Sequence, residues 1–202
     1  MAYMLENPYW IVIIIALIIL TIFVCIKAGA ASSKRYKANE AIMKKLKEEN
    51  ILRNEFAVLT DTLIHNSEPS KLFKGVALNL QKKISDSVNM NAEFGKLNDE
   101  QKSIYALSYV IEDGSENLSN FFKANGQPLT GSALTAFKNL FSGKAAEIFE
   151  YEYNAFDENN EDASVIPEEI KKNDTDFVLL VSAETICETA GKFIKENAEK
   201  FI

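Results

Sequence analysis

The distribution of apolar and polar residues divides the chain into one wholly apolar run and a series of amphipathic segments. The run, YWIVIIIALIILTIFVCI at Tyr9–Ile26, has 18 residues and no charge. A helix of this length would be about 27 Å long, close to the hydrocarbon thickness of a bilayer. Tyr9 and Trp10 also stand where interfacial aromatic residues occur. The sequence therefore predicts one transmembrane helix within an N-terminal region, residues 1–31.

Basic residues follow this run and none precedes it. Residues 27–53 contain eight Lys and Arg but three Asp and Glu. Because lysine and arginine favour the cytoplasmic side, the asymmetry predicts a single-pass protein of the cell membrane, with its N-terminus outside and its C-terminal part in the cytoplasm. The lipid bilayer is thus a predicted partner, and the lysines either contact its head groups or stay solvated. A signal peptide cleaved near Ala30 is the alternative, although its basic leading region is missing.

The rest of the chain shows helical periodicity. Residues 32–66 predict a basic neck helix, and residues 67–202 predict a multi-helix domain. The apolar stripe in the second half of the neck either forms a short coiled-coil seam or packs onto the domain; it consists of Leu52, Phe56, Leu59 and Leu63. No segment predicts a strand convincingly. The predicted fold class is therefore all-α, with one N-terminal transmembrane helix followed by a cytoplasmic multi-helix domain.

Capping residues predict where several helices of the domain begin and end. Ser67 is a candidate N-cap with Pro69 in the first turn. Asn98 and Gln101 have the spacing of a capping box, and Gly114 ends the helix that they begin. The last helix is expected to run unbroken from a cap at Asn173 or Asp174 to the C-terminus.

A short helix, Glu116–Ala124, contains the adjacent Phe121 and Phe122. Asn125-Gly126 follow, and both residue types tolerate the left-handed conformation at a helix end. Neighbouring helical residues point about 100° apart, so both rings are buried only if the helix is covered on two sides. We expect one ring to enter the core and the other to line the groove between the flanking helices. The alternative is that one ring lines a ligand pocket or a partner contact.

The charge pattern distinguishes the neck from the domain. The formal net charge of the chain is −7, yet residues 147–176 contain eleven acids and two lysines. A dense acidic surface attracts basic proteins and repels nucleic acid. We therefore predict a cytoplasmic partner protein with a basic surface and no direct binding of nucleic acid. The predicted partner-binding residues are Asp157, Glu158, Glu161, Asp162, Glu168 and Glu169.

Residues that would carry chemistry are scarce. His65 is the only histidine, and the sequence has no phosphate-binding loop or metal-spaced Cys/His cluster. Four residues of the acidic segment match ligand positions of a calcium loop, but Asp162 replaces the required glycine and Pro167 interrupts the end. Those four residues are Asp157, Asn159, Glu161 and Glu168. The sequence predicts no catalytic residues, no metal site and no cofactor.

The second half of the chain resembles a known family. The stretch LNDEQKSIYALSYVIEDGSENLSNFFKANGQPLTGSALTAFKNLFSGKAAEIFE and the ending AGKFIKENAEKFI are similar to the bacterial DNA mimic protein 19-like family, over about residues 95–202. This chain has DGSENL where the family has a pair of glycines before the aromatic residues. The resemblance implies a helical domain and, as an alternative function, a DNA-mimic regulator that sequesters a basic DNA-binding protein.

The predicted function is therefore a membrane-anchored, non-catalytic protein-interaction module with an acidic face. The DNA-mimic regulator implied by the resemblance and an unrecognised enzyme are the two alternatives.

Overall fold

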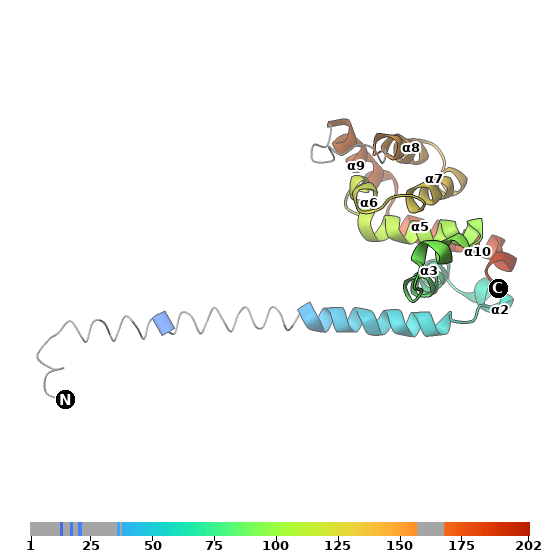
Figure 1. Cartoon of the computed structure of the whole chain (residues 1–202), viewed down its shortest axis with the longest axis horizontal. Coiled ribbons are helices and arrows are strands. Elements are labelled where there is room, and N and C mark those ends of the chain that lie inside the picture. Colours follow the sequence, from blue (N-terminus) through green and yellow to red (C-terminus); the bar gives the residue numbers. More distant parts are fainter. Residues whose placement is uncertain (1–12, 14–16, 18–19, 22–35, 37, 157–167) are drawn as a thin grey trace, which may run out of the picture. The chain divides into compact units, whose positions relative to one another are not determined.

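The computed structural model describes residues 13, 17, 20, 21, 36, 38–156 and 168–202 (Figure 1). The chain divides into two compact units, Met1–Glu48 and Glu49–Ile202. In the first unit every described residue is helical and exposed. The second unit begins within the predicted neck, residues 32–66, and contains all the sites discussed below.

The structure corrects the prediction of a transmembrane helix. Among the described residues, no helix is both long enough and apolar enough to cross a membrane. The run Tyr9–Ile26 lies outside the described residues, apart from Ile13, Leu17, Leu20 and Thr21. An apolar run of 18 residues is near the minimum for a span and becomes one only as a single unbroken helix. The all-α part of the predicted fold class is confirmed, its membrane span is wrong, and the predicted single-pass localisation is wrong with it.

The second unit is built of helices, with no strand among its described residues. Residues 49–55 are helical, and the bounds of the later elements are α2 (Asp61–Asn66), α3 (Pro69–Ser85), α4 (Met90–Gly95), α5 (Asp99–Gly114), α6 (Leu118–Ala124), α7 (Leu129–Leu140), α8 (Lys144–Ala155), α9 (Glu168–Leu180), α10 (Ala183–Glu196) and the 3₁₀ turn η2 (Ala198–Lys200). In Figure 1, α6, α7, α8 and α9 lie to one side of α5, and α3 lies to the other.

Local capping explains several helix boundaries. Asn98 caps α5 as predicted, since its side chain accepts a hydrogen bond from the backbone N–H of Gln101 at 2.8 Å. Gln101 itself donates to the carbonyl of Lys200, so the capping box is only half formed. Helix α3 is capped by Glu68 instead of the predicted Ser67, because the Glu68 carboxylate accepts from two backbone N–H groups of the first turn. These bonds lower the pKa of Glu68.

The predicted last helix is two helices. Ser182 accepts a hydrogen bond from the backbone N–H of Thr185 and starts α10, while α9 ends at Leu180. Asn173 and Asp174, the predicted caps, lie inside α9. The apolar spacing continues through the break, which is why periodicity alone did not reveal it.

Two glycines allow helices to approach closely. A Cβ added to Gly191 of α10 would lie 2.0 Å from the carbonyl oxygen of Pro69 at the start of α3. At Gly75 of α3, a Cβ would lie 2.2 Å from the ring of Phe56. Phe56 is 1% exposed, so the apolar stripe of the predicted neck packs onto the core.

An aromatic cluster fills the part of the core beneath α6. Phe121 and Phe122 are both buried, with 0% and 7% of their surfaces exposed. Their ring centroids lie 5.1 Å apart, and both rings lie near Phe149 of α8. Phe122 also stacks on Phe156 at 5.8 Å. The pair therefore fixes α6 against α8 within the core.

Candidate functional site

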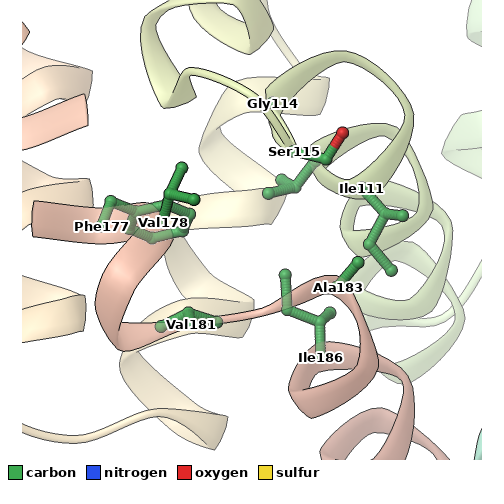
Figure 2. A pocket seen from close by; sticks show the side chains of 9 residues that line it. Ile111, Gly114, Ser115, Phe177, Val178, Val181, Ala183 and Ile186 are labelled. Atoms are coloured by element: carbon green, nitrogen blue, oxygen red, sulfur yellow. The ribbon is translucent and has the colours of Figure 1, made fainter. Parts of the chain in front are cut away.

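A small apolar depression lies where the ends of α5 and α9 meet the start of α10. Its volume is about 10 Å³, room for about one water molecule and far below that of a small-molecule pocket. Figure 2 shows Phe177 and Val178 of α9 facing Ile111 of α5 across it. Its lining also includes Gly114, Ser115, Val181, Ala183 and Ile186.

The local sequence explains why this depression stays on the surface. Helix α5 stops at Gly114 and α9 stops at Leu180, so neither helix covers the space beyond its end. Phe177, Val181 and Ile186 are buried and form the floor. The edge is therefore formed by side chains that remain accessible to a partner.

Three consecutive apolar residues are exposed at the end of α9, and the first of them, Val178, lines the depression. Val178, Leu179 and Leu180 have 38%, 80% and 48% of their surfaces exposed. Because successive helical residues turn by about 100°, Leu179 lies on the outer face of α9, with Val178 and Leu180 on opposite flanks. Contiguous exposed apolar residues of this kind mark interaction surfaces, whereas single ones are ordinary.

The electrostatic surroundings of the depression are negative. The C-terminal ends of α5 and α9 both point here, and neither helix has a basic residue in its last turn. The carbonyl groups at such ends carry partial negative charge. Glu112 and Glu116 are exposed, but neither of them lines the depression. We call Val178, Leu179 and the depression the α5–α9 surface.

A buried pair of carboxyl groups lies between α6, α8 and α9. Asp174 accepts hydrogen bonds from the backbone N–H and the hydroxyl of Ser119, each at 2.7 Å. Glu152 is 0% exposed, and neither of its carboxyl oxygens has a hydrogen-bond partner within the described part of the chain. Burial, and then the charge of Asp174, raise the pKa of Glu152 to about 8, although Lys123 opposes the shift. Glu152 is therefore mostly protonated at neutral pH.

The predicted partner-binding residues fall into two groups. Asp157, Glu158, Glu161 and Asp162 lie outside the described residues. Glu168 and Glu169 lie in the first turn of α9 and are exposed. None of the six belongs to the α5–α9 surface.

Several described acids of residues 147–176 are paired. Glu168 pairs with Lys171 at 2.8 Å, and Glu169 accepts a hydrogen bond from the hydroxyl of Tyr151 at 2.6 Å, which raises the pKa of Tyr151. Two more pairs link neighbouring helices, namely Lys138 with Glu150 and Lys144 with Asp176. This part of the acidic segment is therefore partly neutralised.

The predicted groove residues Phe121 and Phe122 lie in the core, and neither lines the depression in Figure 2. Sequence reasoning missed Val178 and Leu179. The signal that could have found them is the run FVLL, because four successive apolar residues on one helix cannot all face the same core.

The described residues contain no cluster of three or more His, Cys, Asp or Glu side chains that could hold a metal ion. Three of the four residues that match a calcium loop lie outside the described ranges, and Glu168 is the exception. His65 is exposed, with its Nδ1 3.1 Å from the carbonyl oxygen of Asp61, on the surface of α2.

Comparison with known proteins assigns no relative. No protein family, curated protein or solved structure matches the chain. The resemblance to the DNA mimic protein 19-like family therefore stays a prediction.

Proposed function

We propose that this protein is a non-catalytic protein-interaction module whose partner has a basic surface. The observation that carries the proposal is the exposure of Val178, Leu179 and Leu180 at the end of α9, where Val178 also lines an apolar depression. A protein partner would remove these side chains from water, and burial of apolar surface contributes roughly 25 cal/mol per Å² before the costs of association.

The character of the partner is suggested by charge. The formal net charge of the chain is −7, and the α5–α9 surface combines its apolar residues with the C-terminal ends of two helices that have no basic residue in their last turns. A negative surface speeds the encounter with a basic protein and disfavours an acidic one. The acids Asp157, Glu158, Glu161 and Asp162 would add to this attraction over a longer range.

The proposal is tested by using the full chain as bait in a lysate of its own cells, followed by titration of the purified partner in a calorimeter. We expect a defined protein partner whose affinity falls as salt rises, because screening weakens attraction between exposed charges. Retention of no protein at low salt, or turnover of a small molecule by the purified chain, would contradict the proposal.

A further inference from the structure

The buried face of α9 has a carboxyl group at its centre. Three residues of this helix are buried, at helical spacing, namely Ile170, Asp174 and Phe177. Phe177 packs near the ring of Phe149 of α8, with 6.3 Å between the ring centroids. Both carboxyl oxygens of Asp174 instead accept hydrogen bonds from Ser119 of α6. The attachment of α9 to its neighbours therefore depends on a carboxylate as well as on apolar packing.

A second carboxyl group lies near Asp174, on α8. Glu152 is 0% exposed, and both of its carboxyl oxygens lack a hydrogen-bond partner within the described part of the chain. Buried charges in proteins are normally paired or hydrogen-bonded, because an unpaired one is costly. Glu152 therefore fits this site as the neutral acid, and the charge of Asp174 opposes its ionisation further.

Few other charges act on Glu152. Lys123, the one charged residue of α6, favours the carboxylate but is exposed to water. Lys138, the one charged residue of α7, pairs with a glutamate on the accessible side of α8. Tyr151 adjoins Glu152 in the chain, but its hydroxyl donates to Glu169. The remaining titratable groups of α8 and α9 are exposed or partly exposed, so none of them offsets a negative charge at Glu152.

The position of α9 in the fold allows it to move while the other helices stay packed. Helices α3, α5, α7 and α10 pack on one another, whereas α9 packs chiefly on α6 and α8 (Figure 1). Two non-helical residues, Val181 and Ser182, separate α9 from α10 and can act as a hinge. An unfavourable charge beneath one such helix is relieved by a local opening, at a lower cost than unfolding of the whole domain.

We propose that Glu152 is a proton-controlled latch that lets α9 separate from α6 and α8. With Glu152 neutral, α9 stays closed on both helices. Loss of its proton places two like charges in one buried site, and separation of α9 admits water to both. The latch is independent of the proposed function.

The strength of the latch follows from the proton affinity of Glu152 in its two states. Burial, and then the charge of Asp174, raise the pKa of Glu152 to about 8 in the closed state. Water restores the ordinary value of 4.5 in the open state. Between these two pH values, each rise of one pH unit therefore favours the open state by up to about tenfold.

The latch is tested by hydrogen exchange of the full chain, followed by mass spectrometry at about pH 5.5, 6.5 and 7.5 and corrected for the intrinsic effect of pH on exchange. We expect the protection of α9 amides to fall by up to about a hundredfold over this range. Low concentrations of urea should leave it unchanged, because a local opening exposes little surface. Protection in α3 and α10 should fall as urea is added, since those amides exchange by global unfolding.

Two variants assign the effect to one carboxyl group. Glu152→Gln keeps the size of the side chain but cannot ionise, so the protection of α9 should lose its dependence on pH. Glu150→Gln, at a half-exposed position of the same helix, is the matched control and should retain that dependence.

Three results would overturn the latch. The first is protection of α9 that does not change with pH in the parent chain. The second is protection of α9 that falls with urea as steeply as that of α3, because α9 would then open only by global unfolding. The third is a pH dependence that Glu152→Gln retains. The first two results need the parent chain alone, so the latch can be refuted even if the variant does not fold.

Discussion

Ser119 of α6 donates two hydrogen bonds to the side chain of Asp174 of α9, one from its backbone N–H and one from its hydroxyl, each 2.7 Å long. Both residues are buried, at 0% and 4% exposure, and Ser119 lies in the first turn of the short helix that contains the Phe121-Phe122 pair. Hydrogen bonds to an ionised carboxylate are stronger than neutral ones. This contact therefore fastens α9 to α6 beneath the aromatic cluster.

Replacing Ser119 by Ala should destabilise the fold. The substitution removes the hydroxyl donor and leaves one carboxylate oxygen of Asp174 buried without it, which should lower the free energy of unfolding by about 1.5–3 kcal/mol. Urea denaturation followed by circular dichroism measures the change. Ser132→Ala is the control, because the Ser132 hydroxyl donates to the carbonyl of exposed Pro128, the N-cap residue of its own helix. If both substitutions have equal effects, the contact between α6 and α9 contributes nothing.

Glu152 should make stability depend on pH. Its pKa is about 8 in the folded chain, whereas the ordinary value for a solvated glutamate is 4.5. Between these two pH values the folded state binds more protons than the unfolded state. The free energy of unfolding should therefore fall as pH rises from about 4.5 to about 8, by at most about 1.4 kcal/mol per pH unit. Above about pH 8 it should level off. Glu152→Gln should remove this slope, and Glu150→Gln on the accessible side of the same helix should keep it. Urea denaturation at about pH 5.5 and about pH 7.5 measures the change in the free energy of unfolding between the two pH values. An equal change in the parent chain and in Glu152→Gln would refute the prediction.

Gly191 should tolerate no side chain. A Cβ there would lie 2.0 Å from the carbonyl oxygen of Pro69, and backbone at both positions must move apart to admit it. Gly191→Ala should therefore destabilise the fold by about 2–4 kcal/mol. At Gly95, in the last turn of α4, an added Cβ meets nothing within 4 Å. Gly95→Ala should leave stability unchanged or raise it by up to about 1 kcal/mol. Thermal melts that rank the two variants in the opposite order would contradict the close approach of α3 and α10.

Phe121 should be essential to the core. Its side chain is fully buried among Phe122, Phe149 and neighbouring helices. Phe121→Ala should lower the free energy of unfolding by about 3–5 kcal/mol, because it removes apolar burial and leaves a cavity. Val88→Ala, at a fully exposed position, should change it by less than about 0.5 kcal/mol. A Phe121→Ala variant that unfolds at the same urea concentration as the parent would rule out the core role of this ring.

The helical elements of the second unit could be predicted where capping and periodicity agreed. Helix α5 runs from Asp99 to Gly114, as the Asn98 cap and the glycine stop predicted. The break at Ser182 was missed because apolar spacing continues through it. The transmembrane helix was inferred from the length and hydropathy of a sequence run alone, and no helix among the described residues meets both criteria.

The candidate site was harder to predict, because burial depends on tertiary packing. Glu152 was counted with the exposed acids, although it follows Ala145, Ile148 and Phe149 at helical spacing, and all four are buried. That periodicity was the available signal. The α5–α9 surface arises because two helices end at the same place, and no local pattern determines which helix ends meet.

The central claim, that the exposed apolar end of α9 binds a partner protein with a basic surface, is tested most directly by photo-crosslinking in cells. The photoreactive residue p-benzoylphenylalanine replaces Leu179 in one full-length chain and Val88 in a control chain, and mass spectrometry identifies the linked peptides. We predict one partner protein linked at Leu179 and absent at Val88, with the linked peptide belonging to a lysine- or arginine-rich surface of that partner. Absence of a protein crosslink at Leu179, or the same products at both positions, would contradict the account.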